Sequence, residues 1–157
     1  MSLEKAKAHL AQFGREGDVR EFATSSATVE LAAQAVGCEP ARIAKTLSFE
    51  VGERVALVVC AGDARIANPK FKAAFHAKPR MLKADEAEAR IGHAVGGVCP
   101  FGVSGECDVY LDKSLRRFAT VFPACGSSNS AIELSPVELE ELTPGSAWVD
   151  VCKLPEE

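Results

Sequence analysis

One lysine stands among apolar residues in a segment with the pattern of a β-strand. Side chains alternate between the two faces of a strand, so Lys45 in the segment 43–51 shares a face with Ile43, Leu47 and Phe49. An ammonium group on an apolar face must form an ion pair, extend to solvent or contact a ligand. Lys45 is therefore either a lysine that reaches solvent near the strand end or a cation that binds a ligand.

A glycine-rich loop is the second candidate. The segment 96–102 reads Gly-Gly-Val-Cys-Pro-Phe-Gly, with three glycines and one proline in seven residues. Such a turn exposes backbone N–H groups, which can hold a carbonyl or phosphate oxygen. The spacing matches neither a Walker loop nor a dinucleotide fingerprint. The loop is either an ordinary tight connection, which is the more common case, or a backbone site for an oxygen atom.

A turn of small polar residues is the third. The segment 124–130 reads Ala-Cys-Gly-Ser-Ser-Asn-Ser. It is either a plain polar turn between two strands or a second wall of hydrogen-bond donors around a pocket.

The cysteines and histidines give weaker evidence of a functional site than these three segments. Cys99 and His93 could form a thiol nucleophile with its base, but the thiol would need an activating environment. The six cysteines include no C-x-x-C pair, and the three histidines have no metal-ligand spacing. We therefore expect reduced cysteines, no metal and no cofactor.

Composition favours one domain over residues 1–157, in a protein of the cytoplasm. No apolar run reaches the length of a membrane span, and the N-terminus lacks the pattern of a signal peptide. The net charge of −4 argues against binding to long nucleic acid such as DNA.

The charges are unevenly distributed along the chain. The segment 64–84 contains no acid but holds Arg65, Lys70, Lys72, Lys78, Arg80 and Lys83. It is either a solvated lysine-rich surface or a limited contact for phosphates.

Hydrophobic periodicity and capping signals predict the elements that must position these residues. Helices are expected over residues 3–13, 28–36, 69–75 and 85–91 and from 136 onward, with possible N-caps for the second at Thr24, Ser25 and Ser26. Strands are expected over 19–22, 43–51, 55–60, 108–111, 119–122, 132–134 and 148–152. The mixture predicts an α/β domain whose mixed sheet curls toward a barrel and is flanked by helices.

Four motifs occur in a particular order along the chain. They are Ile-Ala-Lys-Thr-Leu at 43–47, the loop at 96–102, Leu-Asp-Lys-Ser-Leu at 111–115 and Ile-Glu-Leu-Ser-Pro at 132–136. Together they resemble the YbaK family, which is related to the inserted editing domain of bacterial prolyl-tRNA synthetase. The likeness extends over residues 22–153.

The resemblance implies a free-standing deacylase that hydrolyses the ester of wrongly charged tRNA, often a tRNA for proline carrying Cys or Ala. Some members have a charged residue in the turn before Ile-Glu-Leu, whereas the turn 127–130 has none, so the amino acid specificity stays open. We expect catalytic groups at Lys45, Gly97, Val98 and Gly102, substrate contacts at Thr46, Gly96, Cys99, Pro100, Phe101, Gly126 and Ser127, and tRNA contacts at Lys70, Lys72, Lys78 and Arg80.

Ester hydrolysis needs a placed water, donors for the oxyanion and a selective pocket. Backbone N–H groups of the loop could be the donors, and Lys45 could hold a phosphate of the terminal adenosine or polarise the ester carbonyl. The expected partners are the acceptor end of tRNA and, further, an aminoacyl-tRNA synthetase. We expect no binding to membranes or to DNA. The alternative is a non-catalytic module that binds tRNA or a nucleotide and associates with a synthetase.

Overall fold

The computed structural model describes residues 2–23, 28–94 and 96–155. The predicted caps Thr24, Ser25 and Ser26 and loop residue Val95 lie outside these ranges. The helices are α1 (Ser2–Ala11), α2 (Val29–Val36), α3 (Asn68–Phe75), α4 (Ala84–Ile91) and α5 (Pro136–Glu141), with 3-10 turns η1 (Glu16–Asp18), η2 (Pro40–Arg42) and η3 (Lys113–Arg117). The strands are β1 (Arg20–Glu21), β2 (Ile43–Val51), β3 (Arg54–Ala61), β4 (Arg65–Ile66), β5 (Cys107–Asp112), β6 (Phe122–Pro123), β7 (Ser130–Ala131), β8 (Ala147–Val149) and β9 (Cys152–Lys153).

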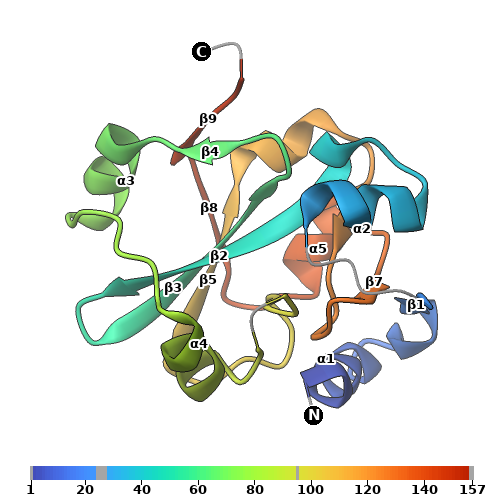
Figure 1. Cartoon of the computed structure of the whole chain (residues 1–157). Helices are drawn as coiled ribbons and strands as arrows, with labels where there is room; N and C mark the ends of the chain where they lie inside the picture. Colours follow the sequence, from blue (N-terminus) through green and yellow to red (C-terminus); the bar gives the residue numbers. More distant parts are fainter. Residues whose placement is uncertain (1, 24–27, 95, 156–157) are drawn as a thin grey trace.

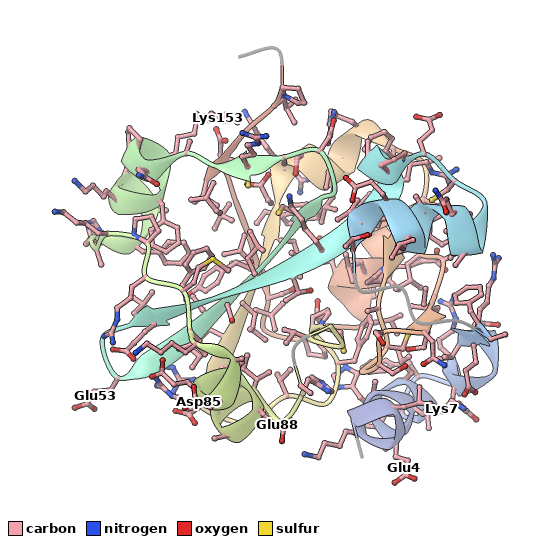
Figure 2. The ribbon with its side chains drawn as sticks, in the orientation of Figure 1. Glu4, Lys7, Glu53, Asp85, Glu88 and Lys153 are labelled. Carbon is pink, nitrogen blue, oxygen red and sulfur yellow. The ribbon has the colours of Figure 1, made fainter. Side chains whose placement is uncertain are left out.

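The central sheet has five strands in the order β6-β2-β3-β5-β8. Strands β2 and β3 form an antiparallel hairpin whose tip is marked by Glu53 in Figure 2, and the other neighbours pair in parallel. The sheet curls into a half-barrel with helices around it, and β1–β7 and β4–β9 form two small separate ribbons (Figure 1). The prediction of a mixed, curled α/β fold is confirmed.

Capping chemistry sets several helix ends, although the N-cap of α2 is Thr28 and not one of the three residues predicted for that role. Thr28 accepts a hydrogen bond from the N–H of Leu31 to begin α2, and Gly37 ends that helix with a φ of 78°. Ser135 begins α5 in a reciprocal capping box with Glu138.

Some predicted boundaries are wrong. Helix α3 begins at Asn68, one residue before the predicted start at 69, and Ala67 takes the N-cap position. The strand predicted at 148–152 divides into β8 and β9, which join different sheets. The strands predicted at 119–122 and 132–134 reduce to a bridge between Val121 and Leu134 beside the short β6 and β7. Local propensity cannot fix these ends, because strand length depends on the partner strand.

Helices α2 and α3 cover two parts of the same face of β2. Ile43 clusters with Ala33 of α2, and the ring of Phe49 lies 4.8 Å from that of Phe71 of α3. Lys45 and Leu47 project from the same face between these two contacts. Helix α4 packs on the opposite face of the hairpin.

The outer edge of β2 is paired only at its two ends. At one end Ile43 and Ala44 pair with β6. At the other, Glu50 N–H donates to the carbonyl of Arg80 at 2.9 Å, and Ser48 accepts from Leu82 N–H at 3.1 Å. Among the described residues no strand pairs with this edge in between. Because backbone groups alternate sides along a strand, the N–H and C=O of Thr46 point out of this open edge.

The motif at 111–115 braces the far end of the hairpin. Asp112 is buried, and its carboxylate accepts from the N–H groups of Ser114 and Val151, each at 2.9 Å. The hydroxyl of Ser114 in turn accepts from Ala61 N–H at 3.1 Å. These bonds fix the end of β3, just before the turn that contacts Lys45.

Candidate functional site

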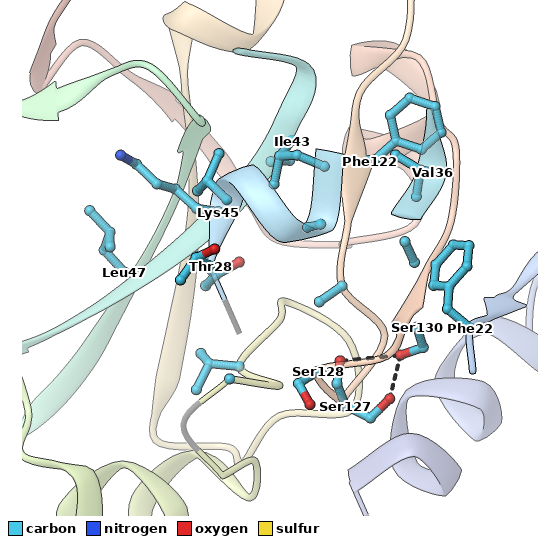
Figure 3. A pocket seen from close by; sticks show the side chains of 18 residues that line it. Phe22, Thr28, Val36, Ile43, Lys45, Leu47, Phe122, Ser127, Ser128 and Ser130 are labelled. Carbon is cyan, nitrogen blue, oxygen red and sulfur yellow. Dashed lines mark hydrogen bonds between the residues drawn. The ribbon is translucent and has the colours of Figure 1, made fainter. Parts of the chain in front are cut away.

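A pocket of about 330 Å³ lies at the open edge of β2 (Figure 3). One wall is the strand itself, another is α2, and the others come from the glycine loop and the serine turn, which we define as residues 126–130. The described lining residues are Phe22, Thr28, Val29, Ala32, Val36, Ile43, Ala44, Lys45, Thr46, Leu47, Gly96, Val98, Phe122, Ala124, Ser127, Ser128, Ser130 and Ala131.

The ammonium of Lys45 is held by backbone carbonyls rather than by an acid. Its Nζ donates to Ala64 O at 2.6 Å and to Gly62 O at 3.3 Å, both in the turn between β3 and β4. In Figure 3 the side chain extends away from the serine turn toward that β3–β4 turn. Two of the three ammonium hydrogens are therefore used, and a positive charge is fixed at one end of the pocket.

The glycine loop reaches the pocket through two residues and packs behind it through a third. Gly96 and Val98 line the pocket. A Cβ added to Gly97 would lie 2.6 Å from the carbonyl oxygen of Gly126 and 2.8 Å from Ser127 Cα. Only glycine permits this approach, so Gly97 holds the loop and the serine turn together.

Six predicted site residues do not line the pocket: Gly97 and Gly126 support its walls, and the other four lie behind it. Cys99, Pro100 and Phe101 are buried, and Phe101 belongs to the main core. Gly102 lies against α1, where a Cβ would be 2.5 Å from the carbonyl oxygen of Lys5. The structure thus brings Lys45, Thr46, Gly96, Val98 and Ser127 together, supports them with Gly97 and Gly126, and places these four behind them.

The Cys99 and His93 pair is sealed inside the protein. The sulfur lies 3.6 Å from His93 Nε2, and both side chains are fully buried. Nε2 also lies 2.7 Å from the carbonyl oxygen of Phe101. A carbonyl only accepts, so Nε2 carries the proton and cannot take one from the thiol.

Burial also suppresses the reactivity of this pair. Desolvation raises the pKa of the Cys99 thiol to about 12 and lowers the pKa of His93. The remaining nitrogen of His93, Nδ1, has no hydrogen-bond partner among the described residues. The pair therefore does not have the environment of a thiol nucleophile.

The hydroxyls of the serine turn largely satisfy one another. Ser127 Oγ lies 2.9 Å from Asn129 Oδ1 and 2.7 Å from Ser130 Oγ, as the dashed lines of Figure 3 partly show. This wall of the pocket is small, polar and uncharged.

Lys45 is the one ionisable side chain among the described residues that line the pocket. In the described part of the chain, no group of three or more His, Cys, Asp or Glu side chains could hold a metal ion. The polar groups that the described residues offer in this pocket are therefore the Lys45 ammonium, backbone groups and the hydroxyls of serine and threonine side chains.

Sequence reasoning missed the apolar wall and the open edge. Val29, Ala32 and Val36 follow helical spacing and are indistinguishable from core residues in the sequence. Their pocket position depends on the short β6, which leaves the edge at Thr46 uncovered. No local signal marks that gap.

The predicted basic stretch is partly neutralised. Lys70 pairs with Asp150 at 3.2 Å, and Arg80 pairs with Glu50 at 2.8 Å. Lys72 and Lys78 are exposed and form no ion pair with an acid of the described residues.

None of the described helices has the length and apolarity that a membrane span requires.

The chain is similar in sequence to a known protein family and to individual proteins. Residues 23–142 match the family described as the aminoacyl-tRNA editing domain. YwhH of Bacillus subtilis (strain 168), named only as uncharacterized, is 55% identical over 154 residues, covering 98% of each chain. EbsC of Enterococcus faecalis (strain ATCC 700802 / V583), named as a candidate Cys-tRNA(Pro)/Cys-tRNA(Cys) deacylase, is 32% identical over 130 residues, or 80% of this chain and 79% of EbsC.

A solved structure is similar to this chain over nearly its whole length. The crystal structure of a candidate trans-editing enzyme for prolyl-tRNA synthetase superposes with a TM-score of 0.87, at 29% identity and 97% coverage of both chains.

Proposed function

The chain belongs to the aminoacyl-tRNA editing domain family, and we propose that it is a trans-acting deacylase that hydrolyses the ester of mischarged tRNA in the cytoplasm. The observation that carries this proposal is the pocket at the open edge of β2. It combines one fixed cation, Lys45, with outward-facing backbone groups at Thr46, and its described residues include no thiol, imidazole or carboxylate. An aminoacyl ester is activated enough to react with water in such a site.

In the proposed step, a water oxygen adds to the ester carbonyl carbon, and the carbonyl oxygen takes up negative charge. The N–H of Thr46 and the N–H groups near Gly96 and Val98 stabilise this oxyanion. The bond from carbon to the ribose oxygen then breaks. The ribose oxygen takes the proton that the water loses, so the products are a free amino acid and tRNA with its hydroxyl restored. The neighbouring ribose hydroxyl or the amino acid side chain assists the proton transfer.

Lys45 has an electrostatic role in this scheme. Because the carbonyls of Gly62 and Ala64 fix its Nζ, the charge needs no reorganisation when substrate arrives. Its remaining hydrogen serves a phosphate of the terminal nucleotide or the ester carbonyl.

The proposed amino acid is small and uncharged, such as Cys or Ala on a tRNA for proline. The volume of about 330 Å³ leaves little space beyond a small side chain and part of the terminal nucleoside. The serine turn has no charge to pair with an ionised side chain, and its hydroxyls are engaged with each other. The names of EbsC and of the structural relative agree with this choice.

For the rest of the tRNA, we propose contacts between acceptor-stem phosphates and the basic stretch. Of the four residues expected to contact tRNA, Lys72 and Lys78 form no ion pair with an acid of the described residues, whereas Lys70 and Arg80 would have to exchange or share their acidic partners. An aminoacyl-tRNA synthetase is the further partner of this proposal.

A second candidate function is binding of charged tRNA without cleavage. It is favoured by one observation, the lack of a carboxylate, imidazole or thiol among the described pocket residues. The two functions differ in whether the ester disappears faster than it does in buffer.

A deacylation panel tests the proposal. Cys-, Ala- and Ser-charged tRNA for proline and correctly charged Pro-tRNA would be incubated with the protein, and the remaining ester measured over time. We expect cleavage of at least one small amino acid and preservation of the correct ester. Binding of all four without acceleration of hydrolysis would favour the second candidate.

A further inference from the structure

The ribbon formed by β4 and β9 places two cations directly opposite each other. In its antiparallel register Arg65 pairs with Lys153, and Ile66 pairs with Cys152. Like charges at directly opposed positions destabilise a strand pair. Both side chains are exposed, and neither forms an ion pair with an acid of the described residues. Lys153 lies at the upper edge of the molecule in Figure 2.

The surroundings add to this charge instead of cancelling it. Lys70 donates to the carbonyl of Cys152 at 3.1 Å, next to Lys153 in the chain. One carboxylate, Asp150, serves both Lys70 at 3.2 Å and Lys113 at 3.0 Å. Asp150 is therefore shared by Lys70 and Lys113 and forms no ion pair with Arg65 or Lys153.

A second acid that lies two residues from the ribbon in the sequence, Asp63, is already engaged. Arg117 binds Asp63 through two hydrogen bonds of 2.5 Å and 3.1 Å. That carboxylate is thus directed to η3 and does not neutralise Arg65.

The ribbon begins where the pocket ends. Lys45 donates to the carbonyl of Ala64, and the next residue in the chain is Arg65. A negatively charged strand that leaves the pocket past the Lys45 ammonium would meet the two ribbon cations next. Arginine and lysine in this arrangement suit the phosphates of a nucleic acid backbone.

We propose that Arg65 and Lys153 form a phosphate clamp for the single-stranded 3′ end of the RNA whose terminal nucleotide occupies the pocket. This inference rests on the proposed function for its ligand. The cost of opposing two cations is offset when a phosphate lies between them, which accounts for a register that is unfavourable in the free protein.

The test compares two double variants with unaltered protein. R65Q/K153Q removes both clamp charges, and K7Q/R54Q removes one lysine and one arginine charge, from α1 and from the first residue of β3. Lys7 lies at the lower edge of the molecule in Figure 2, opposite Lys153. Binding of uncharged tRNA is measured across a salt series, and hydrolysis is measured on a minimal aminoacyl-adenosine. Thermal unfolding establishes that both variants are folded.

We expect R65Q/K153Q to bind tRNA about 10- to 30-fold more weakly near 0.1 M salt, with a salt slope smaller by about 1.4, as roughly 0.7 per lost single-strand contact predicts. K7Q/R54Q should bind like unaltered protein, because neither residue belongs to the clamp or to the basic stretch. Equal affinity and slope in the two double variants, or no tRNA binding by unaltered protein, overturns the clamp. Hydrolysis of the minimal substrate reports on the proposed function separately, because it has no phosphates beyond the pocket.

Discussion

Two regions of this molecule contain residues that could do chemistry, and they differ in access. At the open edge of β2, Lys45 and the backbone of Thr46 face a pocket. Behind the pocket, Cys99 Sγ lies 3.6 Å from His93 Nε2, and both side chains are fully buried. The buried pair has the more reactive residue types, yet the open edge has the means to act on a ligand.

Solvation explains the contrast. Burial disfavours the charged thiolate and imidazolium forms, so it raises the pKa of Cys99 and lowers the pKa of His93. Both shifts make the pair less suited to nucleophilic catalysis. Lys45 is only half-buried, and the carbonyls of Gly62 and Ala64 compensate its charge. A charged side chain in this fold can therefore act on a ligand when hydrogen bonds stabilise its charge and the ligand can reach it.

Removal of the Lys45 charge should have the largest effect. We expect Lys45→Met to lower the rate of deacylation about 1000-fold, because the methionine keeps the stem but loses the fixed cation. Unfolding free energy should fall by no more than about 2 kcal/mol, since two hydrogen bonds are lost while a desolvated charge is removed. Lys72→Met, at an exposed position, is the matched control and should keep its activity on a minimal aminoacyl-adenosine, which lacks the acceptor-stem phosphates that Lys72 is proposed to contact. Full activity in Lys45→Met would remove the open edge from the mechanism.

A proline at position 46 isolates the backbone donor. Thr46→Pro deletes the N–H that faces the pocket, and we expect about 100-fold slower hydrolysis. The fold should persist, because proline is tolerated where the N–H points out of the sheet. Thr46→Val keeps this N–H and loses only the hydroxyl, so it should stay within about tenfold of unaltered protein. Equal rates in the two folded variants would show that the donor lies elsewhere in the pocket.

The sealed region should reveal itself through stability at low pH. Burial lowers the pKa of His93 in the folded state, so the unfolded chain binds a proton at higher pH than the folded one. Stability from this group is complete above the unfolded pKa of about 6.5 and is lost as the pH falls below it, by up to about 1.4 kcal/mol per pH unit.

Urea unfolding at pH 7.5 and 5.5 measures this loss. His93→Gln can still donate to the Phe101 carbonyl and should lose less stability on acidification. His76→Asn alters an exposed histidine with a φ of 57°, which asparagine tolerates, and should retain the full loss. If His76→Asn abolished the acid-dependent loss, the buried site would not be its source.

Much of this comparison could be predicted from the sequence, and the remainder depends on tertiary contacts. Two signals are local in the sequence: the strand alternation that singles out Lys45, and the glycines that permit the close contact at Gly97. Lys45 and Gly97 both take part in the pocket region. The gap beside Thr46 exists because β6 pairs with only two residues of β2, which no local pattern encodes. The burial of Cys99 likewise depends on core residues far away in the chain.

The smallest effect on activity should come from Cys99, and it tests the sealed region most directly. With a pKa of about 12, the thiol is ionised in roughly one molecule in 30,000 at pH 7.5. His93 cannot raise that fraction, because its Nε2 proton is donated to the carbonyl of Phe101. Cys99→Ala should therefore keep its rate of deacylation within about threefold, while unfolding free energy falls by about 1–2 kcal/mol from the small cavity.

Cys38→Ala, at a partly exposed thiol, is the control for any general effect of removing sulfur. Iodoacetamide should label Cys38 in the native protein well before it labels Cys99. Complete inactivation of a folded Cys99→Ala, with rapid labelling of Cys99 at neutral pH, would mean that the buried pair opens to solvent and performs the chemistry now assigned to the open edge.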